Sequence, residues 1–175
     1  MSFLTKDRRD KIKDVIDDLN IEQDLSFPEN SVVVAADRLG VPVKIAKFKD
    51  ETIAGLLDYG DQENDIGPAI FVSSQDAEKK RNFTIAHEIG HLLLHADNGA
   101  GRLKVDRHDV QNLKTKSITE EEADYFAASL LVPGHRLKEI MFKSRMHKWD
   151  LINFCSDYFN VSKSVISNRL KWINF

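Results

Sequence analysis

The chain has 175 residues, a length that fits one domain or one domain with a small appendage. Hydrophobic residues make up 42% of it and charged residues 30%, as in ordinary globular proteins, and the net charge of −3 excludes a general attraction to nucleic acid or anionic membranes. A single cysteine, Cys155, excludes an intrachain disulfide and a cysteine-cluster metal site. No stretch has the apolar run of a signal peptide or a membrane span, so we expect a cytoplasmic protein with no membrane partner.

The first part of the chain predicts short helices followed by short strands. A partly apolar face opposite many charges predicts a packing helix over residues 4–19, and Gly40 ends a second helix. Three strand candidates follow with tight connections, which favours an antiparallel meander. The third of them is either a buried central strand or an edge strand able to bind an extended peptide. The predicted elements are helices 4–19 and 30–39 and strands 41–48, 52–59 and 69–73.

Residues 77–96 predict a long helix that is buried nearly all round, with Ser74 as its candidate N-cap. Within this helix, residues 83–95 read FTIAHEIGHLLLH. At about 100° per residue the polar side chains fall within one narrow stripe, and apolar side chains fill the other faces. A narrow polar stripe on a buried helix must face something polar. The stripe contains Thr84, His87, Glu88, His91 and His95.

The stripe holds the pattern His87-Glu88-x-x-His91. Two histidines four residues apart lie one above the other on a helix face, close enough to share a zinc ion through neutral ring nitrogens. Glu88 leaves the helix on the same side and could reach a metal-bound water as a general base without ligating the metal. The alternative is an amphipathic helix with a solvent face, but a solvent stripe is usually wider and rich in Lys and Glu.

Residues 97–117 follow the histidine-rich helix and have few large apolar residues and no clear period. A segment of this length and composition predicts either a mobile lid beside the site or a disordered crossing. His108 lies within it. This histidine is a candidate ligand or transition-state donor, and the alternative is a solvated loop histidine.

A catalytic zinc needs a third protein ligand, and a predicted helix that Pro133 ends offers three adjacent glutamates. Glu121 lies nearly opposite the buried face of this helix. Glu122 could close a capping box with Thr119. Glu120 lies on the same side of the helix as a row of small residues, along which another helix can approach. We therefore choose Glu120 as the third ligand.

Asp124 lies one helical turn after Glu120. It is a candidate to accept the second N–H of a metal-bound histidine, which would fix the tautomer of that histidine. A competing interpretation places Ser117 at the helix N-cap and uses Glu120 in the capping box. The two interpretations differ in where the Glu120 carboxylate points.

Two segments, RNFTIAHEIGHLLLH (81–95) and EEEADYFAASLLVP (120–133), resemble the ImmA/IrrE family of intracellular zinc metallopeptidases. A softer resemblance extends over about residues 30–135. It implies one zinc ion per chain and a protein substrate, an Xre-type helix-turn-helix repressor, whose cleavage relieves repression of mobile elements, prophages or stress genes. Carried over residue by residue, the ligands would be His87, His91 and Glu120, and the catalytic base would be Glu88.

The chain departs from the family pattern at two positions. Asp124 stands where the family usually has Asn, and Val132 stands where it often has Met. A carboxylate at position 124 adds negative charge beside the site. His95 fits the common HLLLH ending of the family but is spaced wrongly for the third histidine of metzincins, so we interpret it as structural.

The resemblance implies a hydrolytic mechanism. Zinc would lower the pKa of its water and polarise the scissile carbonyl, with manganese as the alternative metal. Glu88 would take the proton from that water and deliver it to the leaving amine. The tetrahedral oxyanion needs one further donor. The candidate donors are Tyr125, His108 and Tyr59.

Three further helices are predicted after Pro133, and the last two form a helix–turn–helix with a polar outer face. This pair resembles a DNA-reading unit, although any antiparallel helix pair gives the same pattern. Direct DNA binding through residues 148–173 is one reading, and the others are packing on the catalytic domain or docking of the substrate repressor. The predicted helices are 135–144, 148–159 and 162–173.

Together these elements predict an α+β fold, with a small antiparallel sheet of about three strands packed on a zincin-like HExxH helix and an all-helical C-terminal part. We expect a metallopeptidase domain over residues 1–134 and a helical subdomain over residues 135–175 packed on it. The alternative function is a DNA-binding or protein-binding transcriptional regulator whose metal site is sensory or inactive. A structural metal module without catalysis would leave Glu88 with no role.

Overall fold

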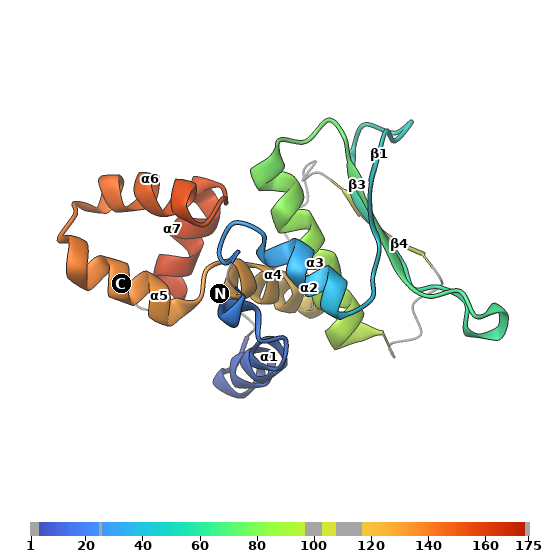
Figure 1. The fold of residues 1–175 in the computed structure, drawn as a ribbon, viewed down its shortest axis with the longest axis horizontal. Helices are drawn as coiled ribbons and strands as arrows, with labels where there is room; N and C mark the ends of the chain where they lie inside the picture. Colours follow the sequence, from blue (N-terminus) through green and yellow to red (C-terminus); the bar gives the residue numbers. More distant parts are fainter. Residues whose placement is uncertain (1–3, 25, 97–102, 108–116, 174–175) are drawn as a thin grey trace.

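The computed structural model describes residues 4–24, 26–96, 103–107 and 117–173. It confirms an α+β fold with a small sheet and an all-helical C-terminal part. Figure 1 shows the sheet at one end of the molecule, α3 and α4 in the middle and α5 to α7 at the other end. The helices are α1 (Lys6–Asp18), α2 (Ser31–Arg38), α3 (Glu78–His95), α4 (Ile118–Leu131), α5 (Gly134–Ser144), α6 (Lys148–Tyr158) and α7 (Lys163–Trp172).

The sheet has four strands in the order β1-β3-β2-β4. β3 pairs with β1 in parallel and with β2 in antiparallel, so it is a central strand and the edge-strand reading of residues 69–73 is wrong. The fourth strand lies in the segment for which we expected a lid or a disordered crossing, and it pairs antiparallel with β2. The strands are β1 (Val43–Ala46), β2 (Ile53–Asp58), β3 (Ala69–Ser73) and β4 (Leu103–Arg107).

Helix α3 lies between the sheet and α4 and is buried against both, in agreement with its nearly continuous apolar pattern. Two glycines allow these close approaches. A Cβ atom at Gly55 of β2 would lie 2.5 Å from Cγ2 of Thr84, and one at Gly90 would lie 3.0 Å from Cδ1 of Phe126 on α4. The N-cap of α3 is Ala77, so the expected Ser74 cap is wrong, because the helix begins at Glu78.

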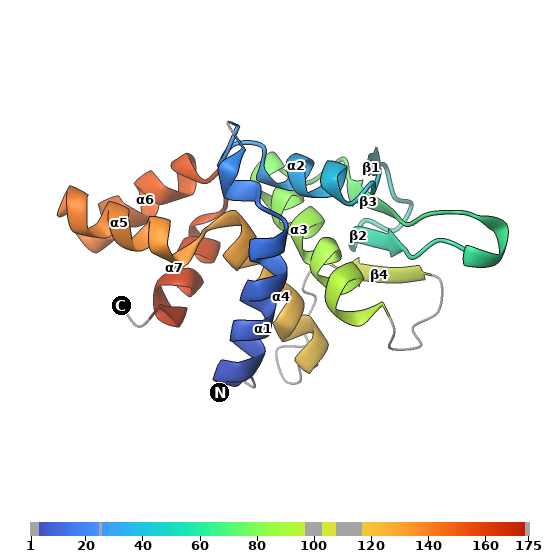
Figure 2. The same cartoon turned by 60° about the horizontal axis from the view of Figure 1, so that its bottom comes forward.

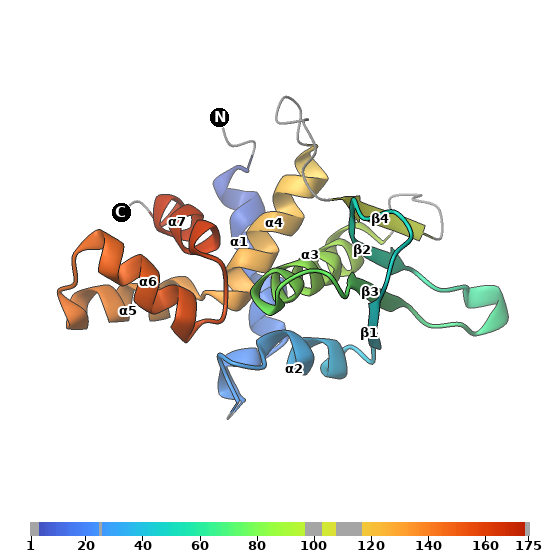
Figure 3. The ribbon, with the colours of Figure 1, turned by 90° about the horizontal axis from the view of Figure 1, so that it is seen from above.

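Helix α1 lies alongside α4, on the side away from the sheet (Figures 2 and 3). Its apolar side chains, with those of the residues just beyond its two ends, are buried in the main hydrophobic core. Burial of each such side chain contributes roughly 1.5–3 kcal/mol to folding before the entropy cost of ordering the chain. The buried residues of this segment are Leu4, Ile12 and Leu19.

The C-terminal helices α6 and α7 form a helix–turn–helix pair that packs on the N-terminal end of α3. Lys79 of α3 donates a hydrogen bond to Asp157 at 2.6 Å, and Glu78 accepts one from Asn160 at 2.6 Å. Asn160 has a positive φ of 50° in the turn between the two helices. In the described part of the chain, no helix is long and apolar enough to cross a membrane.

Candidate metal centre

The three predicted ligands lie together between α3 and α4. Nε2 of His87 and Nε2 of His91 are 3.0 Å apart. Oε2 of Glu120 lies 3.3 Å from the first of these nitrogens, and Oε1 lies 3.4 Å from the second. All three ligand atoms lie within 4.8 Å of one another, so the trio could hold a metal ion. The four-residue spacing on α3 brings the two histidines together, and the close packing of α3 on α4 brings Glu120 to them.

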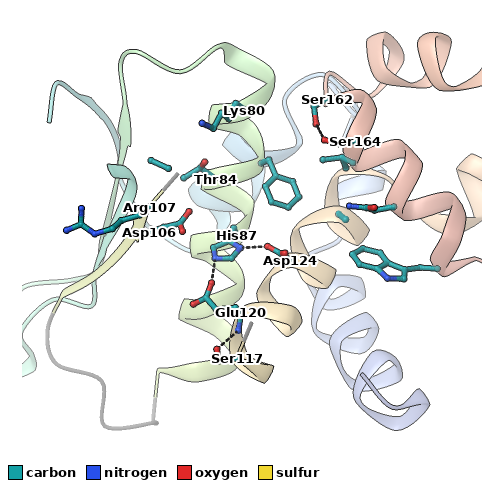
Figure 4. A pocket seen from close by; sticks show the side chains of 16 residues that line it. Lys80, Thr84, His87, Asp106, Arg107, Ser117, Glu120, Asp124, Ser162 and Ser164 are labelled. Atoms are coloured by element: carbon teal, nitrogen blue, oxygen red, sulfur yellow. Dashed lines mark hydrogen bonds and ion pairs between the residues drawn. The ribbon is translucent and has the colours of Figure 1, made fainter. Parts of the chain in front are cut away.

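Asp124 lies beside His87. Its Oδ1 lies 2.9 Å from Nδ1 of His87 and accepts the N–H at that position, which leaves Nε2 of the neutral ring with a lone pair aimed at the site. Figure 4 shows His87 between Asp124 and Glu120. Burial disfavours the charged His87 ring, but the hydrogen bonds to Asp124 and then to Glu120 raise its pKa to about 10.

The second histidine is held in the neutral form. His91 is 1% exposed, and burial lowers its pKa to about 4 against the opposing effect of Glu120. Burial also opposes ionisation of Glu120, but hydrogen bonds with His87, His91 and Lys104 hold the pKa of that carboxyl well below its usual value. With a metal ion in place of the His87 proton, the trio would present two neutral imidazoles and one carboxylate to a common point.

These donors fit a divalent cation. Two neutral Nε2 atoms at 3.0 Å would direct their lone pairs at each other, an arrangement that needs a proton or a metal ion between them. Two imidazoles and a carboxylate are a ligand set that catalytic zinc uses, with the fourth position left for water or substrate. The raised pKa of His87 belongs to the metal-free protein, in which a proton on His87 supplies the positive charge that a metal ion would otherwise bring.

Glu88 is fully buried next to the trio, between α3 and β2. Neither of its carboxylate oxygens has a hydrogen-bond partner within the described ranges. Burial raises its pKa to about 7, against the opposing charges of His87 and Lys104. A buried carboxylate without a partner costs several kcal/mol unless it serves a ligand or a reaction. This arrangement suits a general base that works near neutral pH.

The start of α4 differs from the preferred sequence interpretation. Ser117 is the N-cap and its hydroxyl accepts a hydrogen bond from the Glu120 backbone N–H at 3.2 Å. The capping box between Thr119 and Glu122 is therefore wrong. The Glu120 carboxylate is nonetheless turned to the histidines, because the Ser117 cap uses only its backbone, and Glu122 turns to the end of α3.

Two site residues on β4 are absent from the sequence prediction. Nζ of Lys104 lies 2.8 Å from Oε1 of Glu120, and Asp106 lines the pocket beside His87. Burial raises the pKa of Asp106 despite the opposing charge of His87. The signal was an inverted alternation in LKVDR, where Leu103 and Val105 are exposed while Lys104 and Asp106 turn inward, as in protected edge strands.

The three candidate oxyanion donors are placed differently. Tyr59 is half-buried, and burial, followed by the charges of Glu88 and Glu120, raises its pKa. The ring of Tyr125 instead packs on Trp172 of α7, with centroids 5.2 Å apart. His108 lies outside the described residues. Of the two described candidates, Tyr59 is therefore the one placed within electrostatic range of the metal centre.

A pocket of about 850 Å³ opens from the metal centre toward α7 (Figure 4). Its walls come from α3, β2, β4, α4 and α7, so α7 shares the cavity with the predicted ligands His87 and Glu120. The polar residues Ser164 and Asn168 of α7 line this cavity, so at least part of the polar face of α7 is turned to the pocket. The α7 lining residues are Ser164, Val165, Asn168 and Trp172, with Ser162 just before them.

Comparison with protein families gives one match. The family model described as the IrrE N-terminal-like domain, Peptidase_M78, matches residues 36–171. That segment contains every described residue of the metal centre, α6 and all of α7 except Trp172, and it leaves out α1. Comparison with curated proteins gave no match.

Proposed function

This chain belongs to the IrrE N-terminal-like domain family, and from that premise we propose that it is a zinc-dependent metalloendopeptidase. Membership of a peptidase family makes the general activity peptide-bond hydrolysis on a protein substrate. The observation that carries the proposal is the convergence of His87, His91 and Glu120 beside the buried, unpartnered carboxylate of Glu88. A solvent-facing amphipathic helix would have neither feature.

In this proposal each residue has a defined role. His87, His91 and Glu120 hold the ion, and Asp124 keeps His87 in the ligating tautomer. When bound, zinc supplies Lewis acidity to a peptide carbonyl and to the attacking water. Glu88 accepts the proton of that water and returns it to the leaving amine. Its burial keeps the proton from bulk solvent between the two steps.

Strand β4 supports a role in holding the peptide. It is the last strand on its side of the described sheet, and its next neighbour in the sheet order is β2. An extended peptide could add to the outer edge of β4 by main-chain hydrogen bonds, with Asp106 and Arg107 lining the pocket. One of the two readings of residues 69–73 was an edge strand that binds a peptide, and in this proposal β4 has that role.

We propose an Xre-type helix-turn-helix repressor as substrate, so that cleavage relieves repression of a mobile element, a prophage or stress genes. The support for this is the resemblance of residues 81–95 and 120–133 to ImmA/IrrE peptidases. Because such a repressor works on cytoplasmic DNA, the proposal places the peptidase in the cytoplasm. The pocket that α7 shares with the metal centre supports a docking role, and we therefore propose residues 135–175 as a substrate-docking subdomain in place of a DNA-reading one.

The test is to mix the purified, zinc-loaded protein with the Xre-type regulator encoded beside its gene and to separate the products by mass. We expect a cut product with the parent protein and none with Glu88→Gln, which should keep its zinc. A Glu88→Gln protein that cuts at the parent rate would refute the base assignment. A salt-dependent mobility shift of operator DNA by this protein alone, without cleavage, would favour the regulator hypothesis instead.

A further inference from the structure

A chain of four polar side chains leads from the metal centre through α3 and α4 to α1. Nδ1 of His91 lies 3.0 Å from Nδ1 of His95, and Nε2 of His95 lies 2.9 Å from Oε2 of Glu122. Arg8 donates to the other Glu122 oxygen at 2.5 Å. The exposed fraction of the side chains rises along it, from 1% for His91 and 7% for His95 to 15% for Glu122 and 44% for Arg8.

The positions of the protons in this row of side chains can be worked out by starting from Glu122, near its outer end. The carboxylate of Glu122 only accepts hydrogen bonds, so Nε2 of His95 carries the proton that it shares with Glu122. A neutral imidazole has one N–H, which leaves Nδ1 of His95 with a lone pair. His91 then donates from its own Nδ1, and the lone pair of His91 is on Nε2, the nitrogen that faces the other ligands.

We propose that His95 and Glu122 are positioning residues that hold His91 in the tautomer able to ligate the metal ion. This inference rests on the proposed metal centre and deepens it. It gives His91 the support that Asp124 gives His87, with one imidazole inserted between carboxylate and ligand. The insertion follows from the sequence, because His95 lies one helical turn after His91 on the same rigid helix.

A packing role alone does not account for His95. An apolar side chain of similar size would fill the same space, whereas both ring nitrogens of His95 are hydrogen-bonded, one as donor and one as acceptor. The carboxylate at the end of the chain is kept as an acceptor. Burial opposes ionisation of Glu122, but the hydrogen bonds from His95 and then from Arg8 hold its pKa below the usual value.

The first test measures zinc affinity by competition with a chromophoric chelator, so it needs no substrate. We expect Glu122→Gln and His95→Phe to raise the zinc dissociation constant by roughly 10–100-fold, the range for partners that orient a ligating histidine. Glu139→Gln on α5 is the matched control, since it also removes a carboxylate from an ion pair with a basic side chain, here Lys143. That control should bind zinc as the parent does.

The second test reads the tautomers directly. Long-range ¹H–¹⁵N NMR spectra of the metal-free protein should show the proton of His95 on Nε2 and that of His91 on Nδ1. Glu122→Gln can donate as well as accept, so it should populate the opposite tautomer of His95. If His95→Phe does not fold, Glu122→Gln, at a partly exposed position, is used for both the zinc titration and the NMR experiment.

The outcomes separate the two proposals. Parent-like zinc affinity in both variants, or a His95 proton on Nδ1 in the parent, overturns the positioning role and leaves the peptidase proposal standing. A parent protein that binds no zinc overturns the metal centre, and the positioning role falls with it. Weakened zinc binding in both variants, with the control unchanged, supports the positioning role whether or not the substrate is a repressor.

Discussion

Gly55 on β2 faces the carboxylate of Glu88 so closely that a Cβ atom at this position would lie 3.2 Å from Oε1. The same atom would lie 2.5 Å from Cγ2 of Thr84. We therefore expect Gly55→Ala to push α3 away from the sheet and to displace Glu88. The cost should be about 1–3 kcal/mol of unfolding free energy, as for other overpacked sites, together with loss of most of the peptidase activity.

The matched control for this substitution is Gly67→Ala. A Cβ atom there would meet nothing within 4 Å, so we expect stability and activity close to the parent. Urea unfolding and the repressor cleavage assay measure the two effects. Equal stability of both variants would show that α3 does not need the space that Gly55 leaves.

Glu88 should make the metal-free protein less stable as the pH rises. Its folded pKa is raised from 4.5 to about 7, so the folded state holds the proton more tightly than the unfolded state. The stability from this group is complete below pH 4.5 and is lost as the pH rises to 7. Glu88→Gln should therefore match the parent at low pH and exceed it above pH 7, by on the order of 3 kcal/mol.

This prediction is checked by thermal unfolding of chelator-treated parent and variant between pH 4 and 8. The quantity to follow is the difference in stability between the parent and Glu88→Gln, because the other carboxylates titrate in both proteins and their contributions cancel in this difference. A difference that stays constant over this range would contradict the raised pKa of Glu88.

Zinc removal should lower the melting temperature. With zinc at 100 times its dissociation constant, binding stabilises the fold by about 2.7 kcal/mol. Glu120→Gln removes the charged ligand and should weaken zinc binding by more than the roughly 10–100-fold that orienting partners give. Scanning calorimetry measures the melting temperature, and calorimetric titration measures the zinc affinity. Parent-like zinc affinity in Glu120→Gln would mean that another group supplies the third ligand.

Lys104 should oppose metal binding, because its ammonium group lies on the Glu120 oxygen that the ion would use. Removing this charge in Lys104→Met should tighten zinc binding by roughly five- to tenfold, about 1 kcal/mol for a partly exposed pair. Lys44→Met, on the exposed side of β1, is the control. Weaker zinc binding in Lys104→Met would show that the lysine helps to place Glu120.

Much of this architecture could be predicted from the sequence, because local periodicity fixed it. The long buried helix and the strand over 69–73 follow directly from apolar pattern and length. The ligand pair His87 and His91 needed only helical spacing, and Glu120 needed the direction of the apolar face of α4. These features depend on neighbours within one or two turns.

Other features could not be predicted because they depend on contacts between distant segments. In strand β4 the apolar residues Leu103 and Val105 are exposed and Lys104 and Asp106 turn inward, so its alternation is the reverse of the usual pattern and could be recognised only once the neighbouring strand β2 was known. The parallel pairing of β1 with β3 is set by the whole sheet. The partner of Glu122 is His95 on another helix, and the local capping rule therefore assigned it wrongly.

Helix α1 lies outside the matched segment 36–171, yet it fills part of the core and its Arg8 closes the polar chain at Glu122. A fragment trimmed to the matched segment would leave the outer side of α4 bare and remove the cation that faces Glu122. The boundary of sequence similarity is therefore not the boundary of the cooperative unit. Any study that shortens this protein should keep its first nineteen residues, since Leu4 and Leu19 are both buried.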